Sequence, residues 1–85
     1  MVTTSTRDVE QWFVERIAAR VGVSADDIEL DRPFASYGLG SADCVELSGE
    51  LGERFGGAVS PLFLFDHPTI ERAARSFVSG VGEAP

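Results

Sequence analysis

The chain has 85 residues, of which 44% are hydrophobic and 9% aromatic, so it is one small domain with a single modest core. Its 14 acidic residues outnumber seven basic ones, all arginine, and the net charge of −7 argues against binding to nucleic-acid phosphates. No apolar run approaches the ~20 residues of a membrane span, and a single cysteine excludes an internal disulfide or a cysteine-based zinc site.

The first predicted element is a helix that begins near Thr6 and ends before Gly22. Asp8 suits the positive end of this helix and Arg20 the negative end, and glycine is favoured just after a helix. Residues 1–5 are predicted to be a frayed tail without the basic and apolar regions of a secretory signal, which indicates a cytoplasmic protein. The expected buried face follows helical spacing and contains Val9, Trp12, Phe13, Ile17 and Val21.

Residues 23–40 are predicted to form a long connection because their Gly, Pro, Asp and Ser residues follow no sustained period. Pro33 also disfavours a helical conformation at Arg32. We expect this connection to be held against the core by its own side chains rather than to act as a floppy linker. The expected apolar anchors are Val23, Ile28, Leu30, Phe34, Tyr37 and Leu39.

A second helix is predicted from Ser41 to about Phe55, and the pair Gly56-Gly57 is expected to end it. Gly49 and Gly52 lie inside this helix, where they either permit close backbone packing or loosen the helix. The apolar face is predicted to contain Cys44, Val45, Leu47, Leu51 and Phe55.

Four carboxylates are predicted to form an acidic stripe along another side of the second helix: Asp43, Glu46, Glu50 and Glu53. A charged helix face is usually only solvated. This stripe, however, begins two residues after Ser41, so a partner protein that binds it would be directed onto that serine.

After the second helix, Ser60-Pro61 is a typical helix start, and residues 62–66 are predicted to form a helix of one to two turns. A strand is the alternative for this apolar run, since periodicity cannot separate the two. The last helix opens after residues 67–69 and ends at Gly80, before a tail at 81–85. Its buried face is predicted to contain Ile70, Ala73, Ala74, Phe77 and Val78. The pattern therefore predicts an all-α fold, a domain at residues 6–80 with three main helices and one short helix.

Ser41 stands where a Gly-rich turn meets the predicted start of the second helix. In one interpretation it is only an N-cap, whose side-chain oxygen accepts a hydrogen bond from an unpaired backbone N–H. In the other, its hydroxyl lies exposed at the positive end of the helix and is covalently modified by a phosphate-containing group.

The residues do not support catalysis by the chain itself. Ser41, Asp43 and His67 supply the residue types of a hydrolytic triad, but a domain of this size has little room for a shaped pocket and an oxyanion hole. His67 is expected to serve in capping or packing, and Cys44 to be a small buried hydrophobe. No hydrolase, metalloprotease or nucleotide-binding motif is complete. We predict a non-catalytic domain without a metal site.

Three segments combine into a longer pattern. They are Phe34-x-x-Tyr37-Gly38-Leu39-x-Ser41, then Val45-Glu46-Leu47 with Leu51 and Phe55-Gly56, and finally Leu64-Phe65-Asp66-His67-Pro68-Thr69-Ile70. The pattern covers about residues 9 to 78 and resembles the carrier domains of polyketide, fatty-acid and non-ribosomal peptide synthesis. The last segment and the V-E-L run resemble polyketide-synthase acyl carriers more than stand-alone fatty-acid carriers.

The resemblance implies an acyl carrier protein that bears 4′-phosphopantetheine on Ser41, transferred from coenzyme A by a phosphopantetheinyl transferase. The thiol of that group would hold acyl intermediates as thioesters in polyketide or related lipid biosynthesis. The implied partners are an acyl-AMP ligase or acyltransferase and a ketosynthase, and the isolated domain is expected to be monomeric. The second helix would be recognised by arginine- and lysine-bearing partners through Ala42, Asp43, Glu46, Glu50 and Glu53.

The chain departs from the family's usual D-S-L at the attachment site, where it has Gly40-Ser41-Ala42. The missing aspartate normally helps the transferase to engage, which implies slower modification or a dedicated transferase, with Asp43 as a partial substitute. Gly40, Asp43 and the run Leu47-Ser48-Gly49-Glu50-Leu51 also resemble carriers that receive a fatty acyl starter from an acyl-AMP ligase. The alternatives are a peptidyl carrier and, in another class, an unmodified helical docking module.

Overall fold

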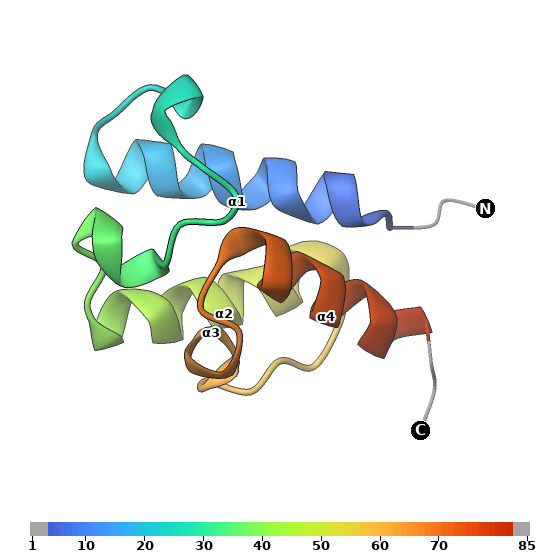
Figure 1. Cartoon of the computed structure of the whole chain (residues 1–85). Coiled ribbons are helices and arrows are strands. Elements are labelled where there is room, and N and C mark those ends of the chain that lie inside the picture. The colour runs from blue at the N-terminus through green and yellow to red at the C-terminus, as the bar shows by residue number, and fades with distance from the viewer. Residues whose placement is uncertain (1–3, 83–85) are drawn as a thin grey trace.

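The computed structural model describes residues 4–82 as a bundle of helices (Figure 1). Its elements are, in chain order, α1 (Thr6–Val21), 3-10 turns at Ala25–Asp27 and Phe34–Tyr37, α2 (Ser41–Phe55), α3 (Phe63–Asp66) and α4 (Ile70–Gly82). This part of the chain contains no strand, and the short apolar run after Pro61 is helical. The predicted all-α bundle of three main helices and one short helix is confirmed. None of the helices in residues 4–82 has the length and apolar character needed to cross a membrane.

The outer helix boundaries differ from those predicted. Ser5, assigned to a frayed tail, is the N-cap of α1: its hydroxyl accepts a hydrogen bond from the Asp8 amide at 3.1 Å, and its own amide donates to the Asp8 carboxylate at 3.3 Å. This reciprocal capping box pairs two backbone donors that the helix leaves open. At the other end, α4 runs two residues beyond Gly80, which does not adopt a left-handed backbone conformation. Residues 1–3 and 83–85 of the predicted tails lie outside the described residues.

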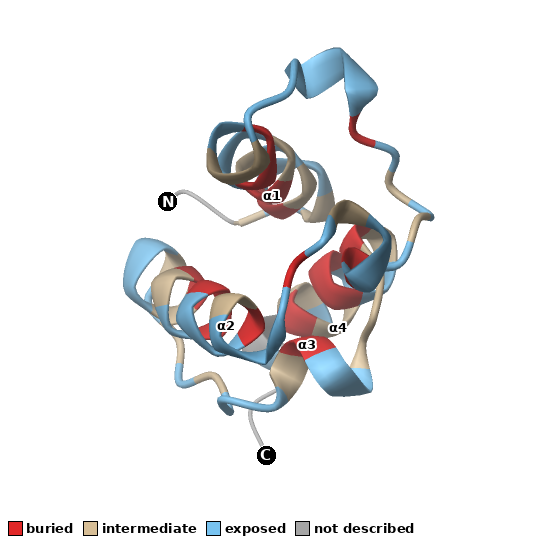
Figure 2. Cartoon of the chain, turned by 90° about the vertical axis from the view of Figure 1, so that its left-hand side faces the viewer, coloured by how far each residue is buried: buried red, intermediate tan, exposed pale blue. Residues whose placement is uncertain are grey.

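The core lies between α1, α2 and α4, whose buried faces point toward a common interior (Figure 2). α1 packs along α4, and α3 packs against α2. Burial of one large apolar side chain stabilises a fold by about 1.5–3 kcal/mol relative to exposure, so this shared interior is the main source of stability. The large apolar side chains with the lowest exposure are Val9, Phe13, Ile17, Leu47, Leu51, Leu64 and Ile70.

Two predicted core positions are wrong. Val45 is 42% exposed because it lies about 100° around the helix from Cys44, outside the inward side that Cys44, Leu47 and Ser48 form. Ser48 is fully buried, and its hydroxyl donates to the Cys44 carbonyl oxygen at 2.9 Å, so no donor is left unpaired there. Val23 is 43% exposed and does not anchor the connection after α1. The anchors that are buried as predicted are Ile28, Phe34 and Leu39.

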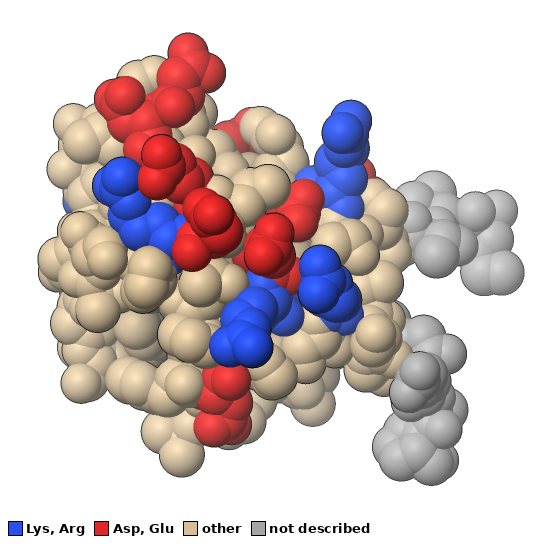
Figure 3. Space-filling view, in the orientation of Figure 1, with Lys and Arg blue, Asp and Glu red and all other residues tan. Residues whose placement is uncertain are grey.

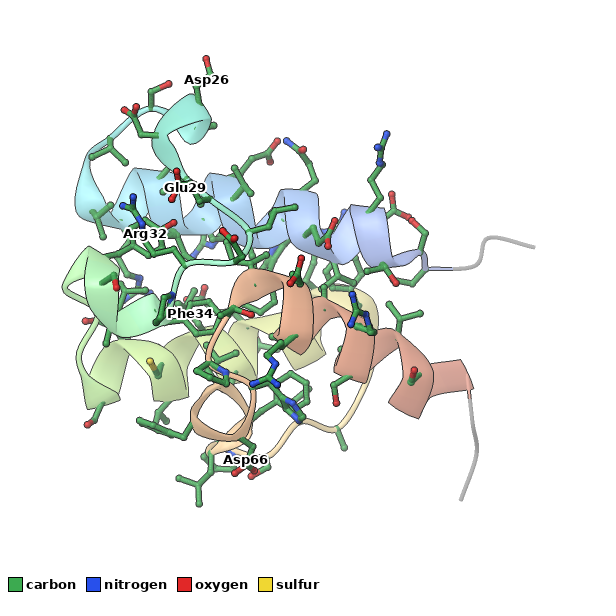
Figure 4. All side chains as sticks on the ribbon, viewed as in Figure 1. Asp26, Glu29, Arg32, Phe34 and Asp66 are labelled. Carbon is green, nitrogen blue, oxygen red and sulfur yellow. The ribbon has the colours of Figure 1, made fainter. Side chains whose placement is uncertain are left out.

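Both a backbone hydrogen bond and a side-chain contact hold the connection that leads to α2 against the rest of the bundle. The Phe34 amide donates to the Pro68 carbonyl at 2.8 Å, which joins residues 23–40 to the segment before α4. The Phe34 side chain points inward from this connection (Figure 4), and its ring centroid lies 5.7 Å from that of Phe13. These contacts fix the segment that precedes the start of α2.

Candidate functional site

Ser41 occupies the first turn of α2 and is exposed. The N-cap is Gly40, one residue earlier than the interpretation of Ser41 as a cap requires, and that interpretation is wrong. Within residues 4–82 the Ser41 hydroxyl takes part in no hydrogen bond. The capping role belongs to Asp43, whose carboxylate accepts the Gly40 amide at 2.9 Å. The hydroxyl of Ser41 is therefore free for chemistry, and the helix start does not depend on it.

The turn before Ser41 is held from two sides. Gly38 has φ = 79°, a left-handed backbone conformation that favours glycine, and it ends the 3-10 turn. The Tyr37 hydroxyl accepts the Glu29 amide at 2.8 Å and donates to the Glu29 carbonyl at 3.0 Å. Leu39 is buried, so its side chain fixes the turn to the core. Ser41 is thus an exposed residue on a rigid support.

The predicted acidic stripe lies against α1. Arg20 Nη1 donates to Asp43 Oδ1 and to Glu46 Oε1, both at 2.9 Å, and Arg20 Nη2 lies 3.5 Å from Glu50 Oε2. Arg16 Nη2 donates to Glu50 Oε1 at 2.8 Å. Only Glu53 of the four stripe residues has no ion pair within residues 4–82. No local sequence pattern indicates these pairs, because Arg20 and Asp43 meet only when α1 packs beside α2.

Two hydrogen bonds hold Asp43 in its ionised form. The Gly40 amide is the larger cause and Arg20 the second, and together they lower the pKa of Asp43 below its ordinary value. In return, the hydrogen bonds with Glu46 and Asp43 raise the pKa of Arg20. The carboxylate nearest to Ser41 along the helix is therefore charged and already paired at neutral pH.

A groove of about 350 Å³ runs beside Ser41, between the turn before α2 and the segment around α3. Cys44 lines it and is buried, and burial raises the pKa of its thiol, so the group stays protonated as the expected small hydrophobe. Phe65 is 46% exposed at the same groove. The rest of the lining includes Leu39, Leu64 and Pro68. Ser41 therefore adjoins an apolar surface.

His67 belongs to another part of the molecule. Its Nε2 lies 3.1 Å from the Ser76 hydroxyl on α4, and its ring packs 4.8 Å from that of Phe63. In the described structure His67 makes no hydrogen bond with Ser41 or Asp43. The three residue types of a hydrolytic triad are therefore not assembled, and His67 has the packing role expected from the sequence.

Exposed charge is not confined to α2. On the face in Figure 3, carboxylates gather over the connection between α1 and α2, and arginines lie beside them as well as over α1 and α4. Asp26 points outward from the first turn of this connection, and Glu29 pairs with Arg32 at 2.9 Å (Figure 4). This second acidic region was not singled out from the sequence.

Comparison with known proteins identifies the family to which this chain is similar. The family described as phosphopantetheine attachment site matches residues 11–77. Over 67 residues, 79% of this chain, the sequence is 37% identical to a phenolphthiocerol/phthiocerol polyketide synthase of Mycobacterium tuberculosis. The chain spans 4% of the length of that relative.

Two solved structures are similar in fold and share 28% sequence identity with this chain. One is a free-standing peptidyl carrier protein from Acinetobacter baumannii, with a TM-score of 0.83 over 91% of this chain and 96% of that one. The other is an acyl carrier protein from Anabaena sp. PCC 7120 with a variant phosphopantetheinylation-site sequence; its TM-score is 0.82 over 93% of this chain and 90% of that one.

Proposed function

Because this chain belongs to the phosphopantetheine attachment-site family, as a carrier domain whose cofactor is covalently bound 4′-phosphopantetheine, we propose that Ser41 is the attachment residue. The observation that carries the proposal is an exposed hydroxyl, without a hydrogen-bond partner among residues 4–82, in the first turn of α2. The Anabaena carrier supports the view that a variant attachment-site sequence is compatible with a carrier protein.

The surroundings of Ser41 fit a phosphodiester that carries a long arm. The first amides of a helix have no partner within the helix and attract negative charge, so the start of α2 favours a phosphate on Ser41. The nearby Asp43 carboxylate is paired with Gly40 and Arg20, which limits its repulsion of that phosphate. Leu39, Phe65 and the other groove residues offer an apolar surface beside the attachment point. When attached, the group supplies a thiol that holds acyl groups as thioesters.

The attachment reaction requires one reactive atom from this chain, the hydroxyl oxygen of Ser41. The Ser41 oxygen forms a bond to the phosphorus that bears the pantetheine arm of coenzyme A, and the pyrophosphate P–O bond breaks. Adenosine 3′,5′-bisphosphate leaves, and the Ser41 proton passes to a base on the transferase. The family is generally non-catalytic, and we propose that this chain itself catalyses no step.

We propose that the carrier serves polyketide or related lipid biosynthesis in the cytoplasm, on the basis of its likeness to a polyketide synthase. The partners would be a phosphopantetheinyl transferase, an acyl-AMP ligase or acyltransferase, and a ketosynthase, with the isolated domain monomeric. The similarity to a free-standing peptidyl carrier supports a second candidate, a peptidyl carrier loaded by an adenylation enzyme. Incubation of the modified protein with each class of loading enzyme separates these candidates by the mass of the acyl group that is gained.

Intact-protein mass spectrometry tests the attachment site. The protein is incubated with coenzyme A and a promiscuous phosphopantetheinyl transferase, with Ser41→Ala as the matched control. We expect the wild type to gain the mass of one phosphopantetheine and the variant to gain none. Modification of the variant would place the arm elsewhere. A wild type that stays unmodified, even with a transferase from the same source, would favour an unmodified helical docking module.

A further inference from the structure

Arg20 joins α1 to the start of α2. It lies in the last turn of α1, and its side chain is 25% exposed. A single nitrogen, Nη1, donates at 2.9 Å to both Asp43 and Glu46, and Nη2 lies 3.5 Å from Glu50. The planar guanidinium fork suits such multiple contacts in a way that a lysine ammonium does not. Arg20 is therefore the centre of the contacts between α1 and the carboxylates of α2.

The contact with Asp43 continues to the residue before Ser41. One carboxylate oxygen, Oδ1, accepts from Arg20, and the other, Oδ2, accepts from the Gly40 amide at 2.9 Å. Gly40 is the N-cap of α2 and has no side chain with which to hold its own position. The hydrogen bonds thus run without a gap from α1, through Asp43, to the turn that presents Ser41.

We propose that Arg20 is a positioning residue for Ser41: it fixes the Asp43 carboxylate, and that carboxylate holds the Gly40 turn that presents Ser41. The proposal rests on the attachment at Ser41 proposed above.

The chain offers a matched control on the same two helices. Arg16 lies one turn before Arg20 on α1 and pairs with Glu50 at 2.8 Å, but it has no contact with Asp43 or Gly40 in the described structure. The variants Arg16→Gln and Arg20→Gln each remove one positive charge and one set of contacts between α1 and α2. Only the second interrupts the hydrogen bonds that lead to Ser41.

The first measurement uses the unmodified protein. The amide resonance of Gly40 is followed by ¹H–¹⁵N NMR during an acid titration, because its hydrogen bond reports the ionisation of Asp43. Besides Gly40, the charged groups around this carboxylate are Arg20 and, through it, Glu46 and Glu50. We expect Arg20→Gln to move the Gly40 midpoint to higher pH, and Arg16→Gln to leave it unchanged. An unchanged midpoint in Arg20→Gln overturns the proposal.

The second measurement is the rate of phosphopantetheine transfer to each variant. We expect Arg20→Gln to reduce kcat/KM by about threefold to tenfold, the effect of one weakened charge-assisted contact, with Arg16→Gln within about twofold of wild type. Arg20→Lys keeps the charge but not the fork, and should lie between wild type and Arg20→Gln in both measurements. Equal rates for wild type and Arg20→Gln contradict the positioning role even if the Gly40 midpoint moves.

Failure of the proposed function gives a different result. Suppose that neither the wild type nor any variant accepts phosphopantetheine, while the Gly40 midpoint moves as expected. The proposal of attachment at Ser41 is then wrong, and the positioning role that rests on it is wrong as well. Circular dichroism checks that each variant folds. If Arg20→Gln does not fold, Arg20→Lys carries the test, and values equal to wild type in both measurements overturn the proposal.

Discussion

The two ends of α2 are built in opposite ways. At the N-terminal end, Ser41 is exposed on a turn that is held by polar contacts through Asp43, beside an open groove. At the C-terminal end, the Gly56 and Gly57 amides both donate to the Gly52 carbonyl, at 2.8 and 3.1 Å, and the chain folds back tightly over the helix. The closed end supplies stability, and the open end leaves room for a reacting partner. Substitutions at the two ends should therefore change different properties.

The largest expected effect on stability is at the closed end. A Cβ added at Gly52 would lie 2.5 Å from the Gly57 carbonyl oxygen, a backbone atom that cannot rotate away. We expect Gly52→Ala to lower the free energy of unfolding by about 1–3 kcal/mol, measured by urea denaturation. Gly49 is the control, since a Cβ there meets nothing within 4 Å. Gly49→Ala should stabilise the helix by about 0.5–1 kcal/mol, and a similar loss in both variants would refute the close-packing explanation.

The acidic side of α2 allows a test of partner recognition at one residue in particular. Reversal of charge at Glu46 or Glu50 also breaks contacts with Arg20, so reduced transfer there would have two causes. Glu53 is exposed and has no ion pair within residues 4–82. We expect Glu53→Arg to reduce kcat/KM for partner enzymes by about threefold to tenfold without lowering Tm.

The outward-pointing Asp26 provides the control for that experiment, because Asp26→Arg makes the same change in net charge away from α2. The kcat/KM of partner enzymes with Asp26→Arg should stay near the wild-type value. Equal losses in Glu53→Arg and Asp26→Arg would indicate a general effect of net charge, and no loss in Glu53→Arg would count against recognition at this end of the stripe.

A smaller, pH-dependent effect is expected at the open end. The pKa of Asp43 is lowered in the folded state, first by Gly40 and then by Arg20, so its ionised form stabilises the fold above the pKa of the unfolded chain, about 4. This contribution is lost as the pH falls through the folded-state value. Wild type should therefore be more stable than Asp43→Asn at pH 7, and the difference should shrink below about pH 4. A stability difference between wild type and Asp43→Asn that stays constant from pH 7 to pH 3 would contradict this role of Asp43.

The two ends also differ in how far the sequence predicts them. Gly22 and Gly56 mark the ends of α1 and α2 correctly, because left-handed caps favour one residue type. The N-cap of α2 is Gly40, one position before the serine that the pattern favours. Gly40 has no side chain that could indicate a cap in the sequence, and the Asp43 carboxylate makes the capping contact instead. The pairing of Arg20 with Asp43 joins residues 23 positions apart and depends on helix packing that no local pattern encodes.

The smallest expected effect separates the two interpretations of Ser41. If the hydroxyl capped α2, Ser41→Ala would lower the free energy of unfolding by about 0.5–2 kcal/mol. In the structure Gly40 is the N-cap and Asp43 holds it, so we expect a change within about 0.5 kcal/mol, measured by urea denaturation of the unmodified protein. A loss above about 1 kcal/mol would mean that Ser41 supports the helix in solution. A near-zero change, together with the complete loss of modification, would mean that the open end of α2 retains this serine for its chemistry alone.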